Sequence, residues 1–296
     1  MKDFRQRFLI ESCDVRGQYI SLDQAWQDAC ARVNYPDTVA MVLGEAFVAA
    51  GLLAATIKFE GKLTLQVRGP GNIHILVVQV TSDGNMRGLA RWQSEPEGHS
   101  LQELFGSDAQ LTIAIEATRG AEPYQGIVAL EGESLSDAIR QYFESSEQLK
   151  TRLQFAVSKD SATGILLQAL PTEERLLEDN DGFVRAVVLA ESLTNAELLD
   201  QSVERLLHMA YHQETVRLFD AEPVAFQCSC GRERIDGMLQ GMGLKEVNDI
   251  LEEQKTIEVT CEFCDETYRY DRVDADALFS ATPGYEASSD APDVEH

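Results

Sequence analysis

Four of the six cysteines cluster in the last quarter of the chain, in two close pairs. The first pair is Cys228-Ser-Cys230 and, after thirty intervening residues, the second is Cys261-Glu-Phe-Cys264. Four thiolates suit the tetrahedral coordination that zinc prefers. Each close pair also places two ligands on one short turn, so that only one long loop has to be closed. We therefore predict one Zn²⁺ ion per chain, bound by these four side chains.

The same thiols allow other interpretations. Iron–sulfur clusters are also held by four thiolates, although a Cys-x-Cys pair is less usual there, and four unrelated thiols are the simplest alternative. Oxidation of Cys261 with Cys264, and of Cys228 with Cys230, would consume all four metal ligands. A Cys-x-Cys disulfide closes a very small ring and should be strained and easily reduced. The four cysteines are thus predicted redox-active thiols as well as zinc ligands.

The residues around the pairs favour a small zinc-dependent module. Residues 256–260 and 267–270 read as two strands of a zinc-knuckle hairpin, with Cys261 and Cys264 in its turn. Residues 232–239 and 244–254 have helical composition. The module contains few core residues, so the metal must supply much of its folding energy. Between Cys228 and Arg272 it carries 11 acidic and 6 basic residues, which disfavours a zinc ribbon that reads DNA or RNA.

The overall charge narrows the possible partners. The 296 residues include 50 Asp and Glu against 25 Lys and Arg, for a formal net charge of −25. Such a chain repels phosphate backbones and anionic lipid surfaces, so we expect no nucleic-acid and no membrane partner. No uninterrupted apolar run reaches membrane-spanning length, and the charged N-terminus lacks a signal-peptide pattern. The expected location is cytoplasmic.

Four domains or segments are predicted. Residues 1–171 alternate apolar and polar side chains in several stretches, interrupted by helical spacings, so the fold class is α+β with a mixed sheet domain at the N-terminus. Residues 172–222 read as a helical linker with 12 acidic and 4 basic residues. Its stripe of Leu199, Val203 and Leu206 should be buried, with the zinc module as the natural neighbour. Residues 223–279 form that module, and residues 280–296 a disordered acidic tail.

Short sequence motifs predict where individual turns and helices lie within these four segments. Ile73, Ile75 and Val77 alternate as one face of a strand that follows a hairpin turn at residues 69–72, and residues 82–85 form a second turn. Helix starts are predicted at Ser21 with Gln24, at Asp37 for a helix to about residue 56, at Ser134, and at Thr194 with Glu197.

The remaining candidate residues have simpler explanations. Cys30 lies beside a helical apolar stripe and Cys13 follows a predicted strand, so both are interpreted as packing thiols. His208 and His212 are four residues apart on a predicted helix, where a metal is conceivable, but the His-Glu-x-x-His pattern is absent. Pairing of surface Glu and His is the simpler interpretation. The sequence also lacks a P-loop and a Gly-x-Ser-x-Gly motif, so neither an ATPase nor a hydrolase is indicated.

The cysteine spacing resembles that of the bacterial redox-regulated chaperone family known as the thirty-three-kilodalton heat-shock protein. The resemblance covers nearly the whole chain, including its length, the acidic helical segment, Val67-Arg68-Gly69-Pro70-Gly71 and Gly84-Asn85-Met86-Arg87-Gly88. No cysteine position departs from the family pattern.

The resemblance implies an ATP-independent holdase rather than an enzyme, inactive when reduced and zinc-bound. Oxidants would release zinc and unfold the module and the linker. The exposed surface would bind unfolding client proteins under oxidative stress, with a homodimer in the oxidised form and hand-off of clients to ATP-dependent chaperones. A thiol-disulfide oxidoreductase using Cys261 and Cys264 remains the alternative, although such enzymes place the pair at a helix N-terminus.

Overall fold

The computed structural model describes residues 3–31, 33–94, 96, 98–117, 124–170 and 181–280. They form two compact units that divide between Cys228 and Ser229. The first unit contains two sheets covered by helices, and the second contains a small hairpin with three helices, so the predicted α+β class is confirmed. Residues 281–296 of the predicted tail and residues 172–180 of the predicted linker lie outside the described residues.

The first unit is built on two largely antiparallel sheets. The five-stranded sheet has the order β10-β1-β2-β9-β8, and the six-stranded sheet the order β11-β5-β4-β3-β6-β7. The first comprises β1 (Phe4–Ile10), β2 (Val15–Leu22), β8 (Thr151–Val157), β9 (Ala162–Ala169) and β10 (Val216–Pro223). The second comprises β3 (Gly61–Arg68), β4 (Ile73–Thr81), β5 (Asn85–Trp92), β6 (Gln110–Ala117), β7 (Tyr124–Ala129) and β11 (Ala225–Phe226). Both predicted turns are confirmed, because they join β3 to β4 and β4 to β5.

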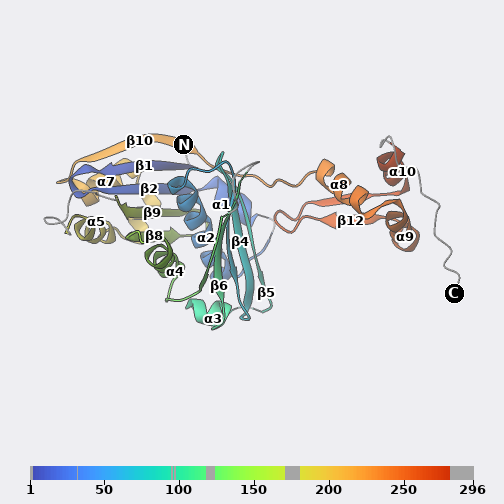
Figure 1. Ribbon diagram of the computed structural model, residues 1–296, viewed down its shortest axis with the longest axis horizontal. Helices are drawn as coiled ribbons and strands as arrows, with labels where there is room; N and C mark the ends of the chain where they lie inside the picture. Colours follow the sequence, from blue (N-terminus) through green and yellow to red (C-terminus); the bar gives the residue numbers. More distant parts are fainter. Residues whose placement is uncertain are drawn as a thin grey trace, which may run out of the picture. The chain divides into compact units, whose positions relative to one another are not determined.

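Helix α2 (Asp37–Thr56) is the centre of the larger core and lies between the two sheets (Figure 1). It spans the predicted residues, but Pro36 rather than the predicted Asp37 occupies the N-cap position. Gly51 lets the five-stranded sheet approach closely, since a Cβ atom there would lie 2.2 Å from the Cδ1 atom of Ile20. By length and composition alone α2 could cross a membrane, but most of its residues are buried in this core. The shorter elements are η1 (Glu11–Cys13), α1 (Gln24–Cys30), α3 (Leu101–Phe105), α4 (Leu135–Tyr142) and η2 (Phe143–Glu147).

Three helices of the predicted linker cover the other face of the five-stranded sheet. They are α5 (Asp181–Glu191), α6 (Asn195–Asp200) and α7 (Val203–Tyr211). Val203 and Leu206 are 2% and 0% exposed and Leu199 is partly buried, so the predicted burial of the stripe is confirmed. The neighbour differs from the expected zinc module: it is the apolar face formed by Phe8, Ile10 and other residues of β1, β2 and β9. The two faces of the five-stranded sheet thus pack into two separate hydrophobic cores.

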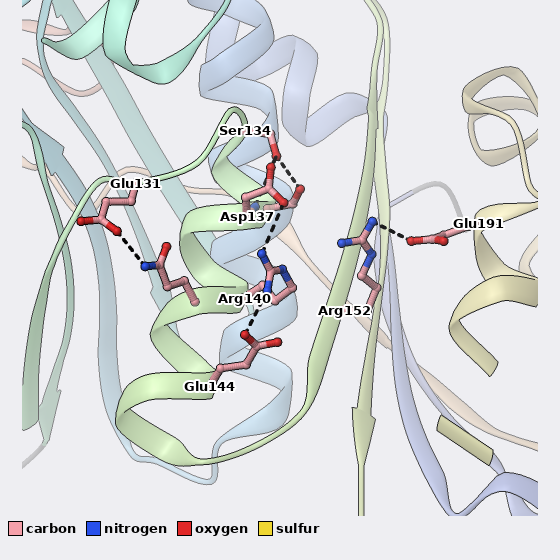
Figure 2. A network of polar contacts seen from close by, with 9 residues as sticks. Glu131, Ser134, Asp137, Arg140, Glu144, Arg152 and Glu191 are labelled. Carbon is pink, nitrogen blue, oxygen red and sulfur yellow. Dashed lines mark hydrogen bonds and ion pairs between the residues drawn. The ribbon is translucent and has the colours of Figure 1, made fainter. Parts of the chain in front are cut away.

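Hydrogen bonds and ion pairs stabilise the surface helices and connect them to neighbouring elements (Figure 2). Ser134 caps α4 as predicted, accepting a hydrogen bond from the backbone N–H of Asp137. Arg140 on α4 pairs with Glu144, four residues later in the following η2, at 2.9 Å. Arg152 on β8 pairs with Glu191, the last residue of α5, at 2.6 Å. This last ion pair attaches the linker to the edge of the five-stranded sheet.

The helix start predicted at Ser21 is wrong. Ser21 belongs to β2, and α1 begins three residues later. The Oδ1 atom of Asp3 accepts the backbone N–H groups of Asp23 and Ala25, at 2.7 and 2.9 Å. A side chain about twenty residues away therefore takes the place of the predicted local cap. At Thr194, by contrast, the predicted capping box with Glu197 is present.

Two further predictions are corrected by strand pairing. The predicted linker is not helical through residue 222, because β10 pairs antiparallel with β1. In β4 the register shifts between Ile73 and Ile75. Beyond the shift, Leu76, Val78 and Val80 face the main core, whereas the predicted inner residue Ile75 is only half-buried.

The second unit is small and centred on one hairpin. It contains α8 (Arg232–Met242), α9 (Leu244–Gln254), β12 (Ile257–Thr260), β13 (Thr267–Tyr270) and α10 (Arg272–Ser280). The predicted helices and strands are confirmed, and α10 is an addition. Among its described residues, the buried apolar core comprises Leu239, Val247, Leu251, Ile257, Tyr270 and Ala275. So few apolar residues supply little folding free energy, and a unit of this size needs another source of stability.

Candidate metal centre

The four paired cysteines come together in the structure. The Sγ atoms of Cys228, Cys230, Cys261 and Cys264 all lie within 4.8 Å of one another. Zinc–sulfur bonds of about 2.3 Å place the sulfur atoms of a tetrahedral site about 3.8 Å apart. The residues present therefore fit a single zinc ion. An iron–sulfur cluster fits less well, because its cysteines bind different iron atoms and are held farther apart.

The turn of the β12–β13 hairpin presents Cys261 and Cys264. The backbone N–H of Cys261 donates to the carbonyl of Glu266, and the N–H of Asp265 donates to the carbonyl of Cys261, each at 2.8 Å. Asp265 closes the turn in the left-handed region, with a φ of 57°. Cys264 is 8% exposed. The predicted hairpin with both cysteines in its turn is thus present, and the pair does not lie at a helix N-terminus.

Strand pairing fixes the chain that leads into Cys228. The two residues of β11 pair parallel with the start of β5, and the N–H of Gln227 donates to the carbonyl of Met86 at 2.9 Å. The guanidinium of Arg87, on β5, lies beside this segment, with Nη1 3.8 Å from the Sγ atom of Cys228. Two hydrogen bonds to Gln79 Oε1, at 2.7 and 2.9 Å, hold Arg87 in place. A cationic donor therefore faces one sulfur atom of the candidate centre.

A second donor comes from the hairpin itself. The hydroxyl of Tyr268 lies 3.3 Å from the Sγ atom of Cys230, which in turn lies 3.3 Å from the Sγ atom of Cys264. The hydrogen bond to Cys230 raises the pKa of Tyr268 above its ordinary value, so the phenol keeps its proton and donates. The sequence does not predict a contact of Tyr268 or Arg87 with a cysteine, although Arg87 lies in the Gly84–Gly88 segment that carries part of the family resemblance. Aromatic alternation in Thr267-Tyr-Arg-Tyr270 indicates a strand, but nothing in it points to a sulfur atom.

The other cysteines lie elsewhere. Cys13, the last residue of η1, is buried beside α5, with Arg185 Nη2 at 3.4 Å from its Sγ atom, and burial raises its pKa. Cys30 is half-buried beside the main core, and burial raises its pKa to about 11. A raised pKa lowers the fraction of reactive thiolate at neutral pH. Both thiols therefore have the environment of packing residues.

His208 and His212 share an exposed face of α7, with ring centroids 6.3 Å apart. Within the described ranges, the only group of three or more His, Cys, Asp or Glu residues close enough to hold a metal is the cysteine cluster. Among the described residues, no third ligand of this kind lies close to the histidine pair.

Comparison with known proteins finds similarity over nearly the whole chain. The family model described as Hsp33 protein matches residues 3–271. A 33 kDa chaperonin of Nitrosococcus oceani is 43% identical over 279 residues, covering 94% of this chain and 95% of that protein. A 33 kDa chaperonin of Methylobacillus flagellatus is 39% identical over 281 residues, covering 95% of each chain. The crystal structure of a 33 kDa chaperonin from Thermotoga maritima has a TM-score of 0.75 at 20% identity, covering 95% of this chain and 98% of that one, and supports the fold. On the family match and the sequence identities, this chain belongs to the Hsp33 chaperone family.

Proposed function

We propose that this protein is a redox-regulated, ATP-independent holdase of the cytoplasm. It is inactive when the four cysteines are reduced and bind zinc, and it becomes active when oxidants convert them to disulfides. The observation that carries the proposal is the convergence of four Sγ atoms within 4.8 Å in a chain of this family. A cytoplasm that keeps thiols reduced would hold the protein in its inactive form until oxidative stress.

The metal would act as a structural cross-link. When bound, zinc would hold the four thiolates together and contribute folding free energy, on the order of 10 kcal/mol in small zinc domains. The second unit has six buried apolar residues in its core. A contribution of that size exceeds what such a core supplies, so the folded state of this unit would depend on the four reduced cysteines.

Oxidation would remove the ligands. A thiolate sulfur attacks one oxygen of hydrogen peroxide, the O–O bond breaks, and a sulfenic acid and hydroxide result; the hydroxide takes up a proton from solvent and becomes water. A second thiol then displaces water from the sulfenic acid and forms the S–S bond, so each disulfide consumes one peroxide and releases two waters. Pairing of Cys261 with Cys264, and of Cys228 with Cys230, would use all four thiols. Hypochlorite is a second two-electron oxidant of thiols, and its reaction would release chloride in place of one of the two waters.

The linker helices α5–α7 are the element that would lose their packing when the four cysteines are oxidised. Helices α5–α7 cover an apolar sheet face that includes Phe8 and Ile10, both fully buried. After α7 the chain forms β10 and then the two-residue β11, immediately before Cys228. Loss of order at the cysteines would leave β11 with only its short pairing to β5. Release of the linker would then expose apolar surface on both the helices and the sheet.

That surface is the proposed site for clients. Unfolding proteins expose apolar segments, and a large exposed apolar patch binds them without nucleotide chemistry. A homodimer of the oxidised form would bury part of the same surface. Reduction would restore the covered state and release clients to ATP-dependent chaperones.

The deciding experiment measures aggregation of an unfolding client with reduced and with peroxide-treated protein, while zinc release is followed in parallel. We expect suppression only after oxidation, with one zinc released per chain. Equal suppression by both forms would contradict redox control. Insulin reduction by the untreated protein would instead support the oxidoreductase alternative, which the hairpin position of Cys261 and Cys264 disfavours.

A further inference from the structure

Tyr268 contacts both the apolar core of the second unit and one of the candidate metal ligands. It lies in the middle of β13, opposite Val259 of β12, and its ring packs against the small core. Its hydroxyl extends from that core to the Sγ atom of Cys230, at 3.3 Å. One side chain therefore joins the module's apolar core to one of the four candidate metal ligands.

A hydrogen bond to a thiolate withdraws electron density from the sulfur. Charge-assisted hydrogen bonds are stronger than neutral ones, and they stabilise the anionic form. Four thiolates around one Zn²⁺ carry a net charge of −2, so each donor that reaches a sulfur favours the bound state. The same loss of electron density lowers the nucleophilicity of the sulfur toward electrophiles such as peroxides.

We propose that Tyr268 is a positioning residue of the redox centre, whose hydroxyl both strengthens metal binding at Cys230 and slows attack by Cys230 on oxidants. This inference rests on the proposed zinc-bound reduced state and adds a determinant of the oxidant threshold. The reaction that it slows is the first step of oxidation, in which the Cys230 sulfur forms an S–O bond while the O–O bond of the peroxide breaks and water leaves.

Substitution Tyr268→Phe in the full-length chain tests the inference, because it keeps the ring and removes only the hydroxyl. Partners outside the first coordination shell typically change metal affinity about 10–100-fold when mutated. We expect zinc affinity, measured by competition with a chelator, to fall by about 10-fold. Zinc release by peroxide should be faster, and alkylation of Cys230, mapped by mass spectrometry, should be faster as well.

A spectroscopic measurement separates this role from general destabilisation. In protein loaded with Co²⁺, the sulfur-to-metal charge-transfer band reports the electron density on the sulfur ligands. Loss of a hydrogen bond raises that density, so the band of Tyr268→Phe should move to lower energy. Replacement of Tyr268 by 4-aminophenylalanine, which restores an N–H donor, should return the band and the alkylation rate toward those of the unmodified chain.

Tyr270→Phe is the matched control. Tyr270 is two residues away on the same strand, but its hydroxyl donates to Asp236 Oδ1 at 2.7 Å rather than to a sulfur. We expect lower thermal stability in that variant with an unchanged Co²⁺ spectrum. A Tyr268→Phe protein with an unmodified spectrum, zinc affinity and Cys230 alkylation rate would overturn the inference and leave the proposed function standing. Absence of bound zinc in the unmodified reduced chain would overturn both.

Discussion

The Sγ atoms of Cys230 and Cys264 lie 3.3 Å apart, although 34 residues separate them in the chain. The contact joins a cysteine that precedes α8 to one in the β12–β13 turn. Two helices lie between them in sequence, so the hairpin and the helices must both be folded for the sulfur atoms to meet. Metal binding by these sulfur atoms would therefore be coupled to the folding of the second unit.

Removal of the second cysteine pair should abolish zinc binding. We expect one zinc per reduced chain and none in the double variant Cys261→Ala/Cys264→Ala, because two remaining thiolates leave half of the coordination sites empty. Metal analysis of purified reduced protein measures this directly. A full zinc complement in the double variant would show that the ligand assignment is wrong.

The two cysteines outside the cluster should be dispensable for the redox response. Cys13 and Cys30 are packing thiols whose pKa values are raised by burial, so neither offers much thiolate to an oxidant. The variant Cys13→Ser/Cys30→Ser should show the same peroxide-induced suppression of client aggregation as the unmodified chain. Loss of activation in a correctly folded variant would reveal a functional thiol outside the cluster.

Oxidation should release the linker helices. Loss of a metal contribution on the order of 10 kcal/mol is comparable with the whole stability of many domains, so the second unit should unfold and α5–α7 should lose protection with it. Hydrogen exchange on the reduced and oxidised protein measures the change. The main-core helix α2 serves as the internal control and should stay protected. Equal protection of the linker helices in both forms would contradict the coupling.

A substitution within the covered interface should bypass oxidation. Leu206 lies on the buried face of α7 and is fully buried, and its replacement by Ala should cost about 2–5 kcal/mol of packing free energy. We expect Leu206→Ala to suppress client aggregation while still reduced and zinc-bound. Val188→Ala, at a position 59% exposed on α5, is the control and should stay inactive. An inactive Leu206→Ala protein with unprotected linker amides would exclude this face as the client site.

Glu45 should make stability fall as the pH rises. It lies on α2 beside a cavity of about 310 Å³ lined by Met41, Leu101 and other residues, and burial raises its pKa from 4.5 to about 7. Because the folded state keeps this proton between pH 4.5 and 7 while the unfolded chain has released it, the free energy of unfolding decreases over that range. The total loss is about 3 kcal/mol at most.

Urea denaturation at pH 5 and pH 8 measures the effect. Glu45→Gln should be more stable than the unmodified chain at pH 8, with a much smaller difference at pH 5. Glu133→Gln, at an exposed position lining the same cavity, is the matched control and should leave the pH dependence unchanged. An unmodified slope in Glu45→Gln would assign the pH dependence to other groups.

The sequence by itself determined the candidate metal centre and much of the local structure. Each ligand pair is held by one short turn, so the Cys228/Cys230 and Cys261/Cys264 spacings already carry the geometry. The capping box at Thr194 and the hairpin turns are likewise made by residues within a few positions of one another. Interactions of that range leave a pattern that can be read from the chain.

The tertiary structure alone decided which surfaces meet. Asp3 replaces a local cap for α1, β10 pairs with a strand more than two hundred residues earlier, and the linker helices choose the five-stranded sheet as their partner. Tyr268 reaches Cys230 across 38 residues. An apolar stripe in the sequence indicates only that its residues must be buried. A strand with a free edge indicates only that this edge must pair with another strand. Which surfaces pack together depends on the competition among all such surfaces in the folded chain. No single residue of the sequence indicates the outcome of that competition.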